Sequence, residues 1–502
     1  MVHRGHMKKK LTKNIVVSFC GQLFVLILGI IIPRVLIINY GSDINGLIST
    51  VTQIFTYMAL LEAGIGQAAR NALFKPIIEN DKNGISYVAS VARNYFRKLT
   101  LIYGLGVLIL SVIVPFILKS NVDKITICLI VLFQGFAGVI SFYFIETQTI
   151  ILNADGRGYV NNGINVINQI ASYVARIVLA FAGVNVALLQ FTYLLITIAK
   201  VFVYRGYFKK NYGWIDYKIA PKTEKLKDRN AYVITELAWT IFSSTDMIVI
   251  STFIGTKVSS VYAVYNMVFS SLNVLLNAVY TSVAYILGQS FHEDKQKYEE
   301  LHDIFTSTFL GIMTVLMSVS YVMILPFVRL YTNGVNDVRY IYKELPLIFC
   351  LIQIISWSRY VTGNLTAIAG YAKNTGRISL IEAMTNVVLS VLLVKRFGII
   401  GVGVATVVAL PLKVVYCAYL SDKKILKRSC KKTISILGAN YLLFSFFVVG
   451  SNLININIVT FVDFIKYGII FTLIASLFGV IVNLIANRDC KKILRIIIGI
   501  KK

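Results

Sequence analysis

The stretch "GIIIPRVLIINYG" at residues 29–41 is almost entirely apolar, yet Arg34 stands near its middle. It closes a longer apolar run that begins near Ile15, and such a run is long enough to cross a membrane as a helix. A guanidinium stays charged at any workable pH, and a charge inside hydrocarbon is expensive. The stretch therefore indicates a membrane-spanning helix whose arginine needs a partner or a function.

The whole chain has the composition of a membrane protein. Its 502 residues are 57% hydrophobic and 15% charged, whereas soluble domains are about 25% charged. Backbone amides in lipid must be paired within their own segment, and the apolar runs lack the ten-residue alternation of barrel strands. The sequence thus predicts an all-α polytopic protein of about 14 transmembrane helices. The expected spans cover residues 14–38, 46–72, 99–118, 125–150, 160–182, 184–204, 230–254, 258–287, 303–328, 344–368, 377–394, 398–420, 433–452 and 460–486.

The net charge of +27 has an uneven distribution along the chain. With a cytoplasmic N-terminus, 34 of the 50 Lys and Arg residues fall in cytoplasmic segments between or beyond the expected spans, and eight fall in external segments. This bias predicts a multi-pass protein of the cell membrane with both termini in the cytoplasm. The positive charge suits the anionic lipids of the inner leaflet, so we expect membrane lipids and no nucleic acid as partners.

The chain repeats itself weakly at an offset of about 214 residues. At this offset Gly41 meets Gly255, Gly156 meets Gly370, and "ENDKNGISY" from Glu79 falls near "HEDKQKYEE". Because each repeat holds six spans, the repeats enter from the same side and form two pseudo-symmetric six-helix bundles. The expected domains are an N-terminal bundle (14–205), a basic linker (206–229), a C-terminal bundle (230–420), two additional helices (433–486) and a basic interfacial tail (487–502). A second interfacial helix is expected at residues 84–98, "GISYVASVARNYFRK".

Charged residues lie deep in the spans of both halves. The cations are Arg34, Arg176 and Arg359, and the acids are Glu62, Asp246 and Glu382. Snorkelling to the headgroups or a structural ion pair between helices would explain each of them singly. A polar cavity between the halves would explain all of them together. There the arginines would bind phosphate oxygens, which match the guanidinium fork, and the acids would pair with cations or exchange ions.

Other chemistry has little support in the sequence. The four histidines have no metal-ligand spacing, none of the six cysteines lies in an external loop, and no cofactor motif is present. The external connections are short and carry neither a metal-spaced acidic pair nor a nucleophile with a base, so we expect no enzyme.

The sequence resembles the Wzx-type polysaccharide flippases of the MOP superfamily, which also holds the MATE transporters and the lipid II flippases. The resemblance is carried by "PRVLIINYGSDINGLISTV" from Pro33, "LLEAGIGQAARNALFKPIIENDKNGI" from Leu60 and "TDMIVISTFIGTKVSSVYAVYNMV" from Thr245. It implies two bundles facing a central cavity, and helices 13 and 14 that hold a lipid tail. It also implies a substrate, an oligosaccharide linked to undecaprenyl diphosphate, that is flipped outward by alternating access for capsular or O-antigen synthesis. A polysaccharide polymerase and chain-length regulators are the implied partners.

Several alternatives stay open on the sequence. A MATE-type exporter of cationic drugs, or a lipid II flippase, would use the same fold for another cargo. A drug exporter predicts a cavity dominated by acids, whereas the deep charges here are mixed. A membrane enzyme or a structural scaffold fits the sequence less well. The driving force is expected to be the membrane potential, H⁺ or Na⁺.

Overall fold

The computed structural model describes residues 2–60, 65–219, 229–451, 453 and 458–491, and every regular element in these ranges is a helix. The chain divides into two compact units, Met1–Ser260 and Val261–Lys502. The sequence repeat assigns α8 to the second bundle, yet α8 packs on α1 within the first unit.

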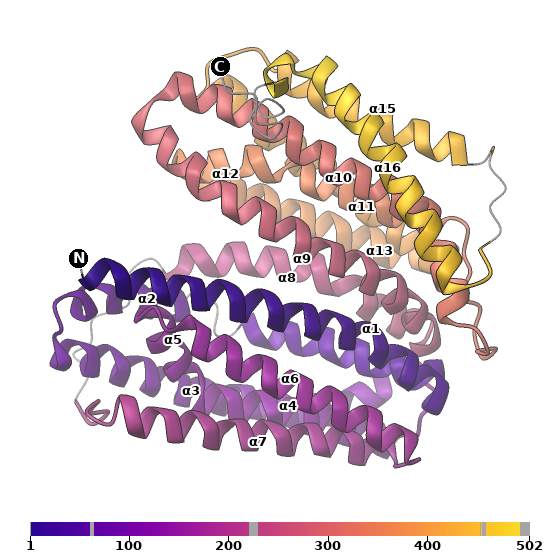
Figure 1. Ribbon diagram of the computed structural model, residues 1–502. Helices are drawn as coiled ribbons and strands as arrows, with labels where there is room; N and C mark the ends of the chain where they lie inside the picture. Colours follow the sequence, from indigo (N-terminus) through magenta and orange to yellow (C-terminus); the bar gives the residue numbers. More distant parts are fainter. Residues whose placement is uncertain (1, 61–64, 220–228, 452, 454–457, 492–502) are drawn as a thin grey trace. The chain divides into compact units, whose positions relative to one another are not determined.

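Within its described residues, the first unit contains eight complete helices and the start of a ninth. They are labelled in Figure 1. The complete helices are α1 (Val2–Ala59), α2 (Ile65–Ile78), α3 (Lys82–Ile117), α4 (Lys124–Phe144), α5 (Glu146–Ala154), α6 (Gly158–Phe181), α7 (Val186–Asn211) and α8 (Arg229–Phe253). Helix α4 packs against both α3 and α7, and α6 packs against α1. Helix α9 (Thr256–Glu293) begins in this unit and continues into the second.

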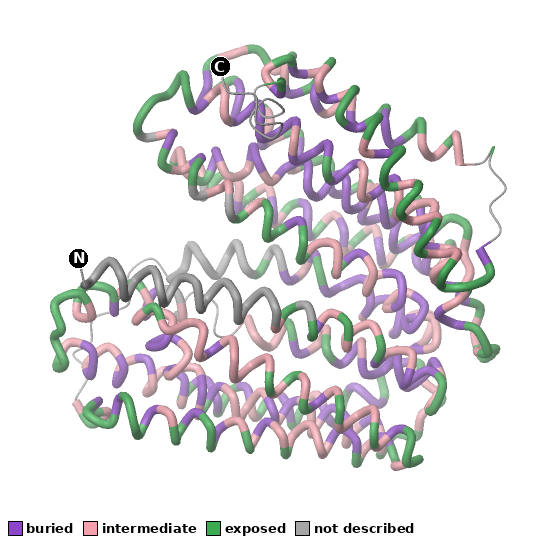
Figure 2. The backbone as a smooth tube through the Cα atoms, in the orientation of Figure 1, coloured by how far each residue is buried: buried purple, intermediate pink, exposed green. Residues whose placement is uncertain are grey.

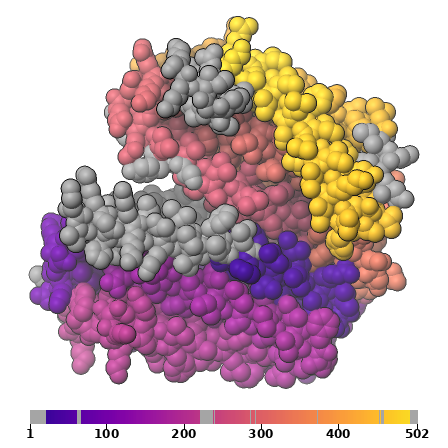
Figure 3. All heavy atoms as spheres, in the orientation of Figure 1, coloured from indigo at the N-terminus to yellow at the C-terminus, as the bar shows by residue number. Residues whose placement is uncertain are grey.

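The second unit contains the rest of α9 and the helices that follow it. They are α10 (Lys295–Tyr331), α11 (Leu345–Ser358), α12 (Tyr360–Ile368), α13 (Ala372–Ala409), α14 (Pro411–Tyr419), the π-helical turn η2 (Leu420–Ile425), α15 (Lys431–Ser451), α16 (Phe461–Ala486) and the 3₁₀ turn η3 (Arg488–Cys490). Helices α15 and α16 both pack on α10, and α16 lies along the surface of this unit in yellow (Figure 3).

Eleven helices in the described ranges are long and apolar enough to cross a membrane, and thirteen of the 14 expected spans lie wholly or partly on them. Two of the eleven, Phe24–Ala59 and Lys373–Ile425, each turn at a glycine and so include parts of two expected spans. The turns are at Gly41 (φ 85°) and Gly398 (φ 60°), where a side chain would be strained. The seventh expected span contains the shorter apolar helix Thr240–Phe253.

The repeat is visible in the backbone. Helices α5 and α12 both begin and end 214 residues apart, and α6 and α13 begin 214 residues apart. The matched glycines all have positive φ, 85° and 146° for Gly41 and Gly255, and 69° and 86° for Gly156 and Gly370. The two halves therefore share helix boundaries and turn glycines at the offset that the sequence predicts.

Aspartate caps begin helices α3 and α10, which occupy matching places in the two halves. Asp81 accepts a hydrogen bond from the Asn83 amide at the start of α3, and Asp294 caps α10 in the same way. These caps satisfy amides that have no partner within the helix. They explain why "ENDKNG" and "HEDKQK" match in the sequence.

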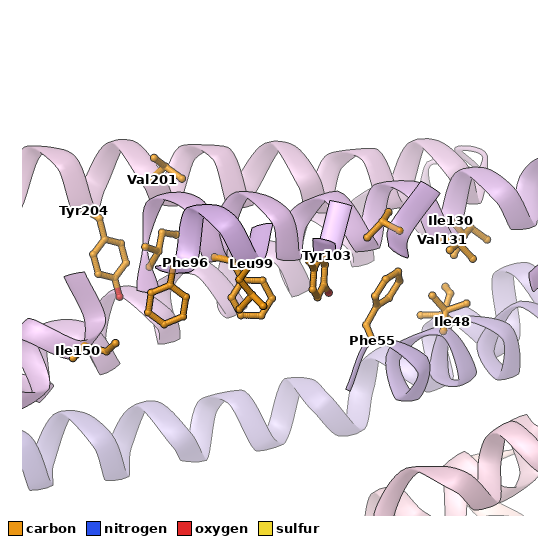
Figure 4. Packing of buried hydrophobic residues seen from close by; sticks show 14 of the residues in the cluster. Ile48, Phe55, Phe96, Leu99, Tyr103, Ile130, Val131, Ile150, Val201 and Tyr204 are labelled. Carbon is orange, nitrogen blue, oxygen red and sulfur yellow. The ribbon is translucent and has the colours of Figure 1, made fainter. Parts of the chain in front are cut away.

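The core of the first unit is formed by large apolar side chains between α1, α3, α4 and α7. Phe96 and Tyr103 of α3 are almost fully buried and point into this core (Figure 4). Tyr103 packs edge-to-face on Phe142, with 4.8 Å between the ring centroids. Buried residues line the inner faces of these helices and exposed apolar residues their outer faces (Figure 2). Exposed apolar faces on long helices are expected where lipid is the solvent.

The expected separate interfacial helix at residues 84–98 is wrong. This segment is the first part of α3, which runs without interruption from Lys82 to Ile117. Ile85, Ala89 and Phe96 of this segment are buried, and Val88 and Tyr95 are partly buried against the core of the unit. Of the expected C-terminal tail, 487–502, residues 492–502 lie outside the described ranges.

Ion pairs made by Arg428 connect the segment that precedes α15 to helix α10. Arg428, between η2 and α15, forms a double hydrogen bond with Asp303 of α10, with both distances 2.7 Å. It also binds Asp422 at 2.7 Å and Glu299 at 2.9 Å. These carboxylates raise the pKa of Arg428 despite its burial. Lys432 of α15 adds a second ion pair to Asp303 at 3.0 Å.

Candidate functional site

Arg34 lies in α1 directly after Pro33, seven residues before the turn at Gly41. Its side chain is half-buried. Pro33 has no amide hydrogen, so the carbonyl of Gly29 lacks its usual helix donor. The sequence therefore places a charge and a weakened helix turn at the same point of the membrane span.

Arg176 is held between α6 and α7 by uncharged groups. Its Nη2 donates to Gln190 Oε1 at 3.1 Å, and its Cζ lies 4.8 Å from the centroid of the Tyr193 ring. The Nε is buried and makes no hydrogen bond in the described structure. Since both contacts are to neutral side chains, neither cancels the positive charge of Arg176.

Arg359 lies at the break between α11 and α12 and is 5% exposed. Its Nη1 donates to Oε1 of Glu382 on α13 at 2.5 Å. Lys413 of α14 interacts electrostatically with both residues. The group of Arg359, Glu382 and Lys413, here called the α12 charge cluster, carries one net positive charge when all three are ionised.

Of the expected acids Asp246 and Glu62, only Asp246 lies in the described residues. Asp246 of α8 is 4% exposed and lies within electrostatic range of Tyr57 on α1. Tyr57 also contacts the Thr245 hydroxyl and the Ile241 carbonyl, so polar groups line the contact of α1 and α8. Glu62 lies outside the described residues.

Of the six expected site residues, the structure brings Arg359 and Glu382 into direct contact. Arg34, Arg176 and Asp246 lie in the first unit, and Arg359 and Glu382 lie in the second. The convergence of the three arginines on one cavity between the bundles stays a prediction.

Sequence reasoning missed Asp43, which is 8% exposed at the end of the α1 turn. Its carboxylate accepts hydrogen bonds from the Ser120 hydroxyl at 2.8 Å, the Asn121 amide at 2.9 Å and the Thr256 hydroxyl. Asp43 therefore joins the turn in α1 to the α3–α4 loop and to the start of α9. Its place in "NYGSDING", two residues after a turn glycine, was the available signal.

An apolar groove separates α10 from α16 within the second unit. Its volume is about 400 Å³. Its lining includes Gly311, Ile312, Val315 and Leu316 of α10, with Gly479 and Val480 of α16. A Cβ on Gly479 would lie 2.6 Å from Val315, so glycine permits the close approach of the helices at one side of the groove.

Similarity to known proteins is found in the fold and not in the sequence. No protein-family model matches the chain, and no curated protein sequence matches it. Among solved structures, "Lipid II flippase MurJ, inward closed conformation" matches with a TM-score of 0.66 and 16% identity. The match covers 95% of this chain and 99% of that one.

MATE transporters and one further MOP protein have the same fold. An inward-facing multidrug resistance MATE transporter matches with a TM-score of 0.65 at 15% identity, covering 82% of this chain and 98% of that one. A transporter from Pyrococcus furiosus, described as having a binding pocket of reverse polarity, matches with a TM-score of 0.57 at 14% identity. That match covers 84% of this chain and 97% of the other. The chain therefore has the MOP-superfamily fold, as the sequence predicts.

Proposed function

We propose that this protein is a flippase that moves an oligosaccharide linked to undecaprenyl diphosphate from the inner to the outer leaflet, for capsular or O-antigen-type polysaccharide synthesis. The observation that carries the proposal is the match to the MurJ fold along 95% of the chain, compared with 82% for the MATE transporter. A polysaccharide polymerase and chain-length regulators are the partners that such a function implies.

The charges support an anionic substrate. Arg176 keeps a charge that its neutral contacts do not cancel, and the α12 charge cluster is net positive. Guanidinium groups bind phosphate oxygens through paired hydrogen bonds, and a diphosphate presents several such oxygens. We assign Arg34, Arg176 and Arg359 to this role. Glu382 pairs with Arg359, and Asp246 and Glu62 remain candidates for ion coupling.

The groove between α10 and α16 suits the lipid part of the substrate. It is lined mainly by apolar groups and lies on a helix of the C-terminal pair. A polyprenyl chain needs no hydrogen bonds and gains little from water, whereas sugar hydroxyls lose several kcal/mol each on alkane scales when they are desolvated without a partner. Separate routes for tail and sugar avoid that cost, with the sugar carried in a wet cavity by alternating access of the bundles.

The membrane potential can supply direction. It contributes roughly 2.3 kcal/mol per charge per 100 mV, and an inside-negative potential favours outward movement of a dianion. Exchange of H⁺ or Na⁺ at Asp246 or Glu62 is the alternative. Measuring translocation with a clamped potential and then with a clamped pH or Na⁺ gradient separates the two.

The test is reconstitution of the full chain in liposomes with a fluorescent diphosphate-linked lipid oligosaccharide, scored by the fraction of label that reaches the opposite leaflet. Arg34→Ala is expected to abolish translocation and Arg34→Lys to restore part of it, because lysine keeps the charge but not the fork. Arg396→Gln removes a cation at an exposed position of α13 and serves as the control. Full activity of both Arg34 variants would remove the phosphate role of this residue.

A MATE-type exporter of cationic drugs is the second candidate, because a MATE structure matches with a TM-score of 0.65. The same liposomes loaded with a fluorescent organic cation test it. Drug efflux without lipid translocation would replace the flippase proposal. If the protein translocates lipid II in preference to the oligosaccharide lipid, then its substrate is lipid II, which is the lipid that the name of the MurJ neighbour gives for that protein.

A further inference from the structure

Three arginines gather at one edge of the first unit, on helices that are distant in sequence. Arg93 and Arg97 lie one helical turn apart on α3, and Arg205 lies on α7. Arg97 and Arg205 both act on Arg93 electrostatically. Helix α4, which packs against both α3 and α7, ends at Phe144 between them.

An aromatic ring lies against each of the three guanidinium groups. The Cζ of Arg93 lies 4.5 Å from the centroid of the Tyr217 ring, and that of Arg97 lies 5.2 Å from the Tyr143 ring. The Cζ of Arg205 lies 4.7 Å from the Phe144 ring. Contacts with ring faces orient a guanidinium but leave most of its N–H donors unused.

The segment that carries Tyr217 is fixed to α3. The Ser90 hydroxyl makes hydrogen bonds to the carbonyls of Tyr217 at 3.1 Å and of Ile219 at 2.8 Å, and the Asp216 amide donates to Ser86. Tyr217 therefore covers Arg93 as part of an ordered structure.

No described carboxylate lies within ion-pair distance of these arginines. Of the acids nearest to them in sequence, Asp81 accepts a hydrogen bond from the Asn83 amide and Asp216 accepts one from the Lys218 amide. Glu146, which follows the Tyr143 and Phe144 rings in the chain, interacts with Lys200. The Nε of Arg97 is buried without a hydrogen-bond partner in the described part of the chain. Arg93 and Arg97 carry like charges one helical turn apart, and these charges repel each other. An anion bound beside them would offset this repulsion.

Measured along the helices from the expected spans, Arg97 and Arg205 fall at the depth of lipid headgroups and Arg93 falls just beyond it. The apolar part of α3 begins at Leu99, so Arg97 lies about 3 Å and Arg93 about 9 Å of helix rise before it. Arg205 follows the end of the expected sixth span at residue 204. The polar layer on each side of the hydrocarbon core is roughly 5–8 Å thick. The positive-inside distribution predicts that this edge faces the cytoplasm.

We propose that Arg93, Arg97 and Arg205 form a phosphate-binding site that holds the headgroup of an anionic phospholipid at the cytoplasmic edge of the first unit. The three guanidinium groups lie close enough to act on one another electrostatically, and guanidinium forks match the several oxygens of a phosphate. The chain itself supplies the membrane depth and the ordered rings, and the phosphate of the lipid would supply the missing negative charge. The site does not depend on the substrate proposed above, and it gives this face of the protein a specific lipid contact.

The test measures lipid binding to the full chain in neutral detergent, by native mass spectrometry during titration with phosphatidylglycerol and, separately, phosphatidylcholine. The test variant is R93Q/R97Q/R205Q. The matched control is K98Q/K209Q/K210Q, which removes three exposed charges from the same two helices. The association constant for phosphatidylglycerol is expected to fall about tenfold for each guanidinium lost, the effect of one charge-assisted hydrogen bond, and to change little in the control.

The outcomes separate the sources of phosphate. A loss specific to the arginine variant, with weak phosphatidylcholine binding, supports a lipid headgroup. Binding of inorganic phosphate that is lost in the same variant, without phosphatidylglycerol binding, supports the phosphate site and assigns a soluble ligand. Equal losses in both triple variants, or no binding of either ligand, would overturn the proposal. If the glutamine variant does not fold, R93K/R97K/R205K decides, since unchanged phosphatidylglycerol affinity there would exclude a guanidinium site.

Discussion

The pair of Arg359 and Glu382 allows a sharp test of how buried charge is balanced in this fold. The two side chains are 2.5 Å apart at Nη1 and Oε1, and the residues are 5% and 2% exposed. Lys413 acts on both of them. The two ways of breaking the pair should therefore have unequal costs.

Glu382→Gln leaves Arg359 and Lys413 as two buried cations without an acid between them. Removal of one member of a buried ion pair costs about 3–5 kcal/mol, and repulsion by Lys413 places this variant at the upper end. Arg359→Gln leaves Glu382 with Lys413 as its remaining counter-charge. Its expected cost is about 1–3 kcal/mol, that of an imperfectly satisfied buried polar group.

The assay is reversible unfolding of the purified protein in detergent micelles with increasing denaturant, which gives the free energy of unfolding of each variant. The double variant E382Q/K413Q should recover part of the loss seen in Glu382→Gln, because it removes the repelling cation. Arg176→Gln serves as a control at a buried arginine with neutral contacts, with an expected loss of about 1 kcal/mol.

Equal losses for Glu382→Gln and Arg359→Gln would refute the reasoning, because Lys413 would then not distinguish the two. So would a further loss of stability in E382Q/K413Q. Either result would mean that the cluster is stabilised by its packing and not by its charge balance.

Three further changes test the fold. Arg428→Gln removes the cation shared by three carboxylates, so we expect a loss of about 3–5 kcal/mol in denaturant unfolding, against little change for the exposed Lys423→Gln. Gly41→Ala should cost about 1–3 kcal/mol because φ is 85°, whereas Gly29→Ala in open space should stabilise the helix by up to about 1 kcal/mol. Burial and a hydrogen bond to a carboxylate raise the pKa of Tyr212. The free energy of unfolding should therefore fall as the pH rises above about 10, where the tyrosine ionises in the unfolded chain. Unfolding midpoints measured across this pH range should fall less steeply in Tyr212→Phe.

The fold was predictable because lipid imposes strong local rules. Apolar runs of sufficient length must be helices, and glycine marks the points where the chain turns between them. Gly41, Gly255, Gly156 and Gly370 were matched in the sequence at one offset, and all four have positive φ. The error at residues 84–98 arose because an amphipathic face on a membrane surface and one packed against another helix have the same periodicity.

The side-chain partners were not predictable to the same degree. Arg359 and Glu382 were both identified as deep charges, but their contact depends on the rotation of α12 and α13, which hydropathy does not specify. Arg93 and Arg205 are more than a hundred residues apart and meet through the packing of α3, α4 and α7. Sequence reasoning found residue types and depths, and tertiary packing determined their neighbours.

A helix breaks at the same matched position in both repeats, but the residue at the break is charged only in the second repeat. At the offset of 214 residues Arg359 matches Ile145, and both lie where one helix ends and a short helix begins. In the first unit the acid next to the break is Glu146, which interacts with Lys200 and leaves no net charge. The second unit also has an acid and a lysine near its break, Glu382 and Lys413, and it has Arg359 in addition. Because the shared geometry exists without the arginine in the first unit, the fold alone does not require Arg359, and this absence of a structural need supports the substrate-binding role proposed for it.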